Sequence, residues 1–268
     1  MTVLAPNVNW LLKDKPLAER LELVADEGFE AIEIGFYGQV DLEELMSVKE
    51  RCGLRVALLN MDVPGWGPGN RGFMADPSRK DAFNTALDRA LAVAKMLQAP
   101  KLMLPVGASI PGLTSEAQMA SIVDNLIHAG PLAERDGVLL TIEPLSPTFA
   151  SDYFMTSSAQ ALDIVHTVNH PHVKFQFDTY HLQMTEGNLI STLRGNIDAI
   201  GHIQFADVPG RTEPGHGELN FPNIARAADE AGYSGYIGLE YVPISEGVAT
   251  FDWIPAGWRR SNTPPSEL

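Results

Sequence analysis

Short apolar or β-branched runs alternate with longer amphipathic stretches along the whole chain of 268 residues. The short runs have the composition of buried strands, and the longer stretches repeat apolar residues at helical spacing. This alternation predicts an α/β fold in which helices connect parallel strands. We predict eight strands, at Leu4–Trp10, Ala31–Gly35, Leu54–Leu59, Lys101–Val106, Val138–Glu143, Val173–Asp178, Ala199–Phe205 and Tyr236–Glu240.

Seven of the intervening segments predict α-helices. Asp41 and Thr114 stand where a helix N-cap is expected, and Gly53 and Gly137 follow helical stretches as C-cap glycines do. The predicted helices are Leu17–Glu27, Leu42–Arg51, Arg79–Leu97, Glu116–Arg135, Ser158–Val168, Leu189–Asn196 and Phe221–Glu230.

Eight strand–helix units without a dividing linker predict a single-domain (β/α)8 TIM barrel over residues 1–268, with 245–268 as a C-terminal closing segment. The alternative is a doubly wound open sheet. Such a sheet more often carries a glycine-rich phosphate loop after its first strand, and the sequence around Asn9 is not one.

The charge balance restricts the partners of the chain. Lys and Arg number 19 and Asp and Glu number 34, so the net charge is −15. A field this negative repels nucleic acids and anionic membranes, and the sequence has no basic run to overcome it. The single cysteine, Cys52, excludes an internal disulfide and a thiolate metal site. We expect a cytoplasmic protein; self-association into a homo-oligomer stays open, because no stretch identifies an interface.

Four consecutive predicted strands end in polar residues that bind metals in other proteins: Glu143, Asp178, Gln204 and Glu240. In TIM barrels the carboxyl ends of the strands form the active site. Alternate side chains of a strand point to opposite faces, and in each of these strands the apolar residues take the other face. We therefore expect all four polar side chains to point into the barrel mouth.

Three carboxylates and an amide buried together predict a divalent cation between them. Without a partner each group would cost several kcal/mol to bury, and like charges would force protonation. Oxygen ligands favour a hard ion, Mg²⁺ or Mn²⁺, although the nearby His181 and His202 keep zinc or cobalt open.

Several motifs resemble the hydroxypyruvate isomerase family, within the xylose-isomerase-like barrels. They are TIEPLSP (141–147), KFQFDTYHLQMTEGNL (174–189), GHIQFADVPGRTEPGHGELNF (201–221), YIGLEYVP (236–243) and GNRGFMADP (69–77). The resemblance implies a metal-dependent aldose–ketose isomerase acting on a small hydroxy-oxo acid. It also implies that Glu143, Asp178, Gln204 and Glu240 hold the metal, with Glu143 and Glu240 as the proton-transferring pair.

For such an enzyme we expect interconversion of hydroxypyruvate and tartronate semialdehyde through an enediolate. Isomerases of 2-oxo-tetronate are a close alternative, and a ketose 3-epimerase or a dehydratase could use the same barrel. A DNA-repair endonuclease of the superfamily would need more histidines and a basic groove, which argues against it. A sugar-acid binding protein without turnover is the remaining alternative.

Five basic residues are candidate partners for the substrate carboxylate: Arg71, Lys174, His181, His202 and Arg211. Arginine matches a carboxylate with two parallel donors, and the loop of Arg211 could close as a lid. Lys174 shares a strand face with Asp178, so it could instead neutralise buried carboxylates. Glu33 ends an inward face and is expected either to face the site or to be solvated or paired.

Overall fold

Eight parallel strands are hydrogen-bonded side by side in the order β1-β8-β7-β6-β5-β4-β3-β2. This structure is a computed structural model that describes residues 2–38 and 40–260. The strands are β1 (Val3–Pro6), β2 (Ala31–Ile34), β3 (Arg55–Asn60), β4 (Lys101–Met103), β5 (Leu139–Ile142), β6 (Val173–Asp178), β7 (Ile200–Phe205) and β8 (Tyr236–Leu239).

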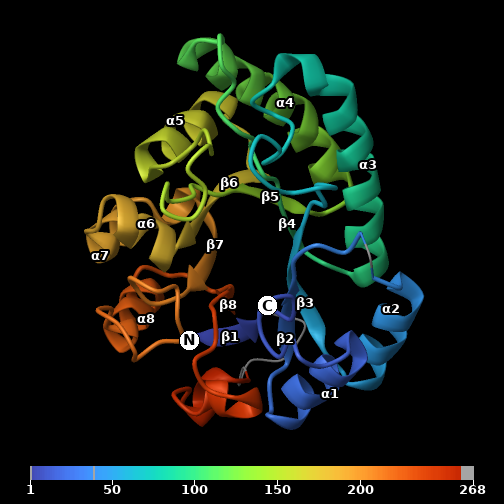
Figure 1. The fold of residues 1–268 in the computed structure, drawn as a ribbon, viewed down its shortest axis with the longest axis vertical. Helices are drawn as coiled ribbons and strands as arrows, with labels where there is room; N and C mark the ends of the chain where they lie inside the picture. Colours follow the sequence, from blue (N-terminus) through green and yellow to red (C-terminus); the bar gives the residue numbers. More distant parts are fainter. Residues whose placement is uncertain (1, 39, 261–268) are drawn as a thin grey trace.

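Helices surround these strands on the outside (Figure 1). They are α1 (Leu17–Asp26), α2 (Leu42–Arg51), α3 (Lys80–Leu97), α4 (Ser115–Arg135), α5 (Ser158–Val168), α6 (Thr179–Thr185), α7 (Leu189–Gly195) and α8 (Phe221–Glu230). The predicted (β/α)8 TIM barrel is therefore confirmed, and the alternative open sheet is wrong.

The sheet closes on itself between its first and last members, β1 and β2. Asn7 and Glu33 form a parallel bridge there, and the backbone N–H of Val8 donates to the carbonyl of Glu33 at 3.1 Å. The side chains of Asn7 and Glu33 are both fully buried. The seam of the barrel thus delivers two polar groups to its interior.

The alternation of side chains along the strands divides the interior from the helix layer. In β6, Phe175 and Phe177 belong to the hydrophobic core, whereas Gln176 and Asp178 contact polar groups of neighbouring strands. The same parity places Gln204 of β7 among polar groups. The outer core packs the strands on the helices, and the barrel interior is polar.

The structure differs from the predicted elements in several places. Strand β1 ends at Pro6 and β4 at Met103, short of the predicted Trp10 and Val106, because pairing with the neighbouring strands stops there. Helix α6 follows β6 without a loop and was missed, because its seven residues are too few for a periodic pattern. Its N-cap is Asp178, whose carboxylate accepts from the backbone N–H of Tyr180 at 2.7 Å and of His181 at 3.3 Å. Strands β5 and β8 end one residue early, so Glu143 and Glu240 directly follow them.

The described part of the expected closing segment, residues 245–260, packs against the barrel through short 3-10 helices. The ring of Phe251 meets Phe29 edge-on with centroids 4.9 Å apart, and Arg259 binds the carboxylate of Glu27 at 2.6 Å. Residues 261–268 lie outside the described residues. No helix among the described residues is long and apolar enough to cross a membrane.

Candidate metal and substrate site

A cavity of about 380 Å³ lies at the carboxyl ends of the strands. Trp10, Phe36, Trp66 and Phe149 supply aromatic walls. Its polar lining consists of Asn9, Lys13, Asn60, Glu143, His181, Arg211 and Glu240. A small anionic or hydroxylated molecule in this space would meet carboxylates, a guanidinium and aromatic rings.

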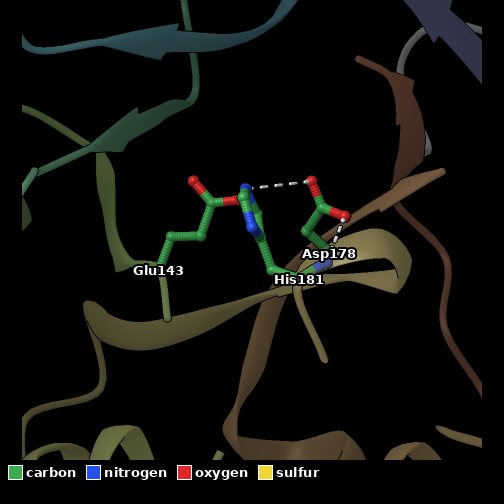
Figure 2. A group of neighbouring side chains, drawn as sticks. All are labelled: Glu143, Asp178 and His181. Atoms are coloured by element: carbon green, nitrogen blue, oxygen red, sulfur yellow. Dashed lines mark hydrogen bonds and ion pairs between the residues drawn. The ribbon is translucent and has the colours of Figure 1, made fainter. Parts of the chain in front are cut away.

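Two predicted metal ligands meet at this cavity. Glu143, Asp178 and His181 each offer one ligand atom within 4.8 Å of the others, and all three are buried (Figure 2). Glu143 follows β5, Asp178 ends β6, and His181 lies on α6. Residues separated in the sequence converge here because adjacent parallel strands end at one rim.

Unsatisfied polar atoms mark the same place. In the described part of the chain, four buried side-chain atoms that line this cavity have no hydrogen-bond partner: Asn60 Oδ1, Glu143 Oε1, His181 Nε2 and Arg211 Nε. Buried polar atoms are normally paired, so such a cluster indicates a site for a ligand or ion. The carboxylate oxygens of Glu143 and Asp178 fit a hard divalent cation.

His181 is held by the backbone and lies beside Asp178 at this site. Its Nδ1 accepts from the backbone N–H of Ser146 at 3.1 Å, so that nitrogen carries no proton. Burial, and then the charge of Arg211, lower the pKa of His181 well below its usual range, which keeps the ring neutral. The proton must then reside on Nε2, which points toward Asp178 at 3.9 Å.

Arg211 neutralises part of the carboxylate charge. Its Nη2 donates to Glu240 Oε2 at 2.7 Å and to Asp178 Oδ2 at 3.4 Å. The guanidinium carbon lies 4.4 Å from the ring centroid of Trp10 and 4.5 Å from that of Phe149. One nitrogen of the guanidinium thus bonds two carboxylates, while its Nε has no partner and keeps donor capacity for a substrate carboxylate.

The loop that carries Arg211 is held in place by Asp207. Its buried carboxylate accepts from the backbone N–H groups of Val208, Gly215, Gly217 and Leu219 at 2.9 to 3.1 Å. Arg211 itself has a left-handed backbone with φ of +54°. The guanidinium is therefore presented to the cavity by an anchored turn.

Burial disfavours the charged form of each carboxylate here. It raises the pKa of Glu240 to about 8 and that of Asp178 to about 6, while Arg211 opposes both shifts. The pKa of Glu143 is raised well above its usual range, first by burial and then by the charges of Asp178 and Glu240. One guanidinium does not balance three carboxylates.

Gln204 and Glu240 reach the same region through hydrogen bonds. Gln204 lies opposite Asp178 in the β6–β7 register, and its amide bonds Gln176 and Glu33. Burial raises the pKa of Glu33 to about 8, opposed by the donors of Gln204 and Asn7 and by the charge of Lys101. The expectation that Glu33 might be solvated is wrong, since its side chain is fully buried.

Three of the predicted substrate partners lie outside the cavity. Lys174 begins β6, donates to the carbonyl of Asp198 and lines a separate cavity of about 650 Å³. Lys174 precedes Asp178 by four residues, which is roughly 13 Å along a strand. The two side chains share a strand face but therefore lie at different ends of the barrel. Arg71 pairs with Asp152 at 3.1 Å and lies 5.2 Å from the Trp66 ring, behind the cavity wall.

The third, His202, lies one layer below the carboxylates. Its Nε2 bonds Glu33 and its Nδ1 lies 3.4 Å from Lys101 Nζ. Burial, and then the charge of Lys101, lower its pKa well below the usual range. His202 is thus a buried neutral ring with no access to a substrate.

Sequence reasoning missed Lys13, Asn7, Gln176 and Asp207. Lys13 follows the first strand in a polar turn, where lysine is common and carries no signal. Parity could have found Gln176, which shares its face with Asp178. Asn7 directly follows β1, and Asp207 lies two residues after β7. Their roles follow only from their long-range hydrogen bonds.

The raised pKa values predict a pH dependence of stability in the metal-free protein. Folded Glu240 and Glu143, with Glu33, retain protons that the unfolded chain releases above about pH 4.5, so stability falls as pH rises toward 8. His181 and His202 act oppositely, but only below their ordinary pKa of 6.5. Between pH 6.5 and 8 we therefore expect a loss of up to about 1.4 kcal/mol per pH unit for each protonated carboxyl group.

Urea unfolding in EDTA at several pH values between 6.5 and 8 measures this slope. The control variant Glu218→Gln, which changes an exposed loop carboxylate, should keep the wild-type slope. A metal-free protein whose stability rose across this range would contradict the raised pKa values.

Comparison with known proteins agrees with the barrel fold. The family model described as "Xylose isomerase-like TIM barrel" matches residues 21–256. A hydroxypyruvate isomerase of Escherichia coli is 33% identical over 92% of this chain and 96% of its own length. A 2-oxo-tetronate isomerase of Pectobacterium atrosepticum is 33% identical over 91% of this chain and 93% of its own.

A solved structure from Brucella melitensis, described as an AP endonuclease of family 2, is also similar. It superposes with a TM-score of 0.93 at 30% identity, covering 97% of this chain and 100% of that one. The family match and the two isomerase relatives confirm the resemblance seen in the motifs. The chain belongs to the xylose isomerase-like TIM barrels, among the relatives of hydroxypyruvate isomerase.

Proposed function

We propose that this protein is a metal-dependent aldose–ketose isomerase that interconverts hydroxypyruvate and tartronate semialdehyde. The observation that carries the proposal is the cavity floor, where Glu143, Asp178 and Glu240 are buried with Arg211 as the one guanidinium among them. The isomerases of hydroxypyruvate and 2-oxo-tetronate among its relatives support the reaction class. The single cysteine suits the cytoplasm as the place of action.

Four residues would hold the cation: Glu143, Asp178, Gln204 and Glu240. Mg²⁺ or Mn²⁺ suits this all-oxygen set, in keeping with the protonated Nε2 of His181. When bound, the cation acts as a Lewis acid that favours negative charge on the substrate oxygens.

The two glutamates would move the carbon-bound proton. Glu143, whose Oε1 has no hydrogen-bond partner, takes a proton from C3 of hydroxypyruvate and leaves an enediolate. Glu240, in its protonated form, gives a proton to C2, and the hydroxyl proton passes from the C3 oxygen to the C2 oxygen. The proton taken by Glu143 then returns to Glu240 through solvent, which restores both glutamates. The Nε2–H of His181 is free to donate to a substrate oxygen.

Two other activities use the same groups. An isomerase of 2-oxo-tetronate is favoured by the relatives of that name, and the 380 Å³ cavity has room for a four-carbon acid. A ketose 3-epimerase would apply the same glutamates to the two faces of one carbon. DNA cleavage is disfavoured, because a net charge of −15 opposes binding of a polyanion.

Lys13 is the side chain that we expect to recognise the substrate carboxylate. It lines the cavity, and its Nζ lies 4.6 Å from the Trp10 ring centroid. Arg211 lies 4.4 Å from the same centroid, so the two cations are at most 9.0 Å apart, the sum of these distances. Within residues 2–38 and 40–260, Lys13 makes no ion pair.

The Lys13→Met variant should therefore raise KM for hydroxypyruvate about five- to tenfold with kcat nearly unchanged, as loss of a partly solvated charge contact predicts. Lys15→Met is the matched control, since Lys15 pairs with Glu19 and Asp14. Steady-state kinetics of both variants provide the measurement. Equal KM values for the two would remove Lys13 from substrate binding.

Proton NMR of the EDTA-treated protein in D₂O tests the reaction itself. Hydroxypyruvate is supplied with and without Mg²⁺ or Mn²⁺, and tartronate semialdehyde is followed. Metal-dependent conversion is the expected result. Without conversion, 2-oxo-tetronate and then ketoses are tested, and inactivity on all three classes would overturn the proposal.

A further inference from the structure

A buried carboxylate that the proposed mechanism does not use lies beneath the cavity. Glu33 comes from the β1–β2 seam, and its Oε1 bonds His202 Nε2. Its Oε2 accepts from Gln204 Nε2 at 2.8 Å and from Asn7 Nδ2 at 3.3 Å. Every side chain that faces this carboxylate is thus a donor.

The backbone is shaped to admit this side chain. A Cβ atom added at Gly238 of β8 would lie 1.7 Å from Glu33 Oε1, so only glycine leaves room for the carboxylate. Gly238 stands two residues before Glu240 on the same strand face. The position of Glu33 is therefore set by the sheet itself.

These contacts determine which way the Gln204 amide points. Its nitrogen donates to Glu33, and its oxygen accepts from Gln176 Nε2 at 2.8 Å. The reversed amide would set oxygen against a carboxylate and nitrogen against a donor. Gln176 could itself turn, whereas Glu33 Oε2 accepts from both Gln204 Nε2 and Asn7 Nδ2, and the ionised carboxylate has no proton to donate, so ionised Glu33 fixes the orientation.

The other side of Glu33 is also oriented. Lys101 Nζ lies 3.4 Å from His202 Nδ1, which makes that nitrogen the acceptor and leaves the proton on Nε2, facing Glu33. Asn7 Nδ2 bonds Glu33 and also Glu240 Oε1, at 3.3 Å each. Glu33 thus touches one proposed metal ligand directly and a second through Asn7.

We propose that Glu33 is a positioning residue that holds the Gln204 amide with its oxygen available to the cation and, through Asn7, steadies Glu240. This role rests on the proposed function, because it requires Gln204 to be a metal ligand. Carboxylates that orient metal ligands commonly change metal affinity 10- to 100-fold when replaced.

Mn²⁺ binding by the whole chain, followed through the EPR signal of free Mn²⁺ at pH 8.0, tests the role without catalysis. Glu33→Gln should weaken Mn²⁺ binding at least tenfold, because the NH₂ group of the new glutamine would face one of the donors that the carboxylate now accepts from. Glu30→Gln, three residues earlier and outside the interior network, is the matched control and should bind as wild type.

The double variant E33Q/Q204E, in which the side chains at positions 33 and 204 are exchanged, is the sharper test of Mn²⁺ affinity and is called the exchanged pair below. A glutamate at 204 offers oxygen in either orientation, and a glutamine at 33 can donate to it, so the pair restores the contact. We expect its Mn²⁺ affinity within about threefold of wild type, with circular dichroism confirming the fold.

Wild-type affinity in Glu33→Gln, or a folded E33Q/Q204E protein that binds Mn²⁺ no better than Glu33→Gln, would overturn the role of Glu33. If Glu33→Gln does not fold, the exchanged pair decides alone. If the wild-type chain binds no Mn²⁺, the cation site of the proposed function is wrong, and the role of Glu33 is overturned with it.

Discussion

Glu143→Gln is expected to reduce kcat for hydroxypyruvate at least ~10³-fold while the protein stays folded. The substitution keeps the size of the side chain and removes the base together with the negative charge of one cation ligand. The Glu143 carboxyl group is buried and its Oε1 has no hydrogen-bond partner, so no contact of that atom is lost. Turnover at saturating Mn²⁺ is the measurement.

Deuterium exchange separates the two glutamates. In D₂O, Glu240→Gln should still exchange the C3 protons of hydroxypyruvate above the uncatalysed rate but form little product, because the base is intact. Glu143→Gln should lose both exchange and product. Glu218→Gln, in an exposed loop, is the control with wild-type rates. Isomerisation at near wild-type rates in either site variant would contradict the two-glutamate mechanism.

Arg211→Met should destabilise the metal-free protein by about 3 kcal/mol at pH 7.5, as loss of one partner of a buried ion pair does. The guanidinium is the group that pairs with Glu240 and Asp178, and its side chain is only 6% exposed. For a chain of this size the loss corresponds to a melting temperature about 6 to 12 °C lower. Thermal melting by circular dichroism measures it.

Two comparisons distinguish charge from packing in this variant. Adding Mg²⁺ should restore part of the lost stability, because the ion replaces the missing positive charge. Arg71→Met is the control: Arg71 pairs with Asp152, whose side chain is 28% exposed, so its loss should cost about 1 kcal/mol or less. Equal melting temperatures for the two variants would exclude the assigned role of Arg211.

Local patterns were sufficient to predict the barrel and the four strand-end residues. Strand parity depends only on the backbone, so Asp178 and Gln204 could be assigned to the interior without any knowledge of their neighbours. Parallel strands also end at one rim, which brings Glu143 and Glu240 toward them. The pairing of Arg211 with these carboxylates was not predicted, because its loop indicated only a partner for the substrate carboxylate.

The position of a side chain along the barrel axis and the residue with which it pairs could not be predicted in this way. Lys174 has the right parity, yet it lies at the opposite end of the barrel from Asp178. Arg71 and Lys13 are both basic residues after strands, and only their neighbours distinguish the ion pair with Asp152 from the open cavity wall. A linear pattern contains no information about such neighbours.

The sequence alone determined the fold class, the rim that carries the site and the oxygen-rich character of its residues, because periodicity and parity are local properties of the backbone. Only the tertiary structure decided that Glu33 is buried below Gln204, that His181 Nδ1 accepts from the backbone of Ser146, and that Arg211 is paired with Glu240. Each of these depends on the distance between groups on different strands and loops, and folding sets those distances by packing the whole barrel.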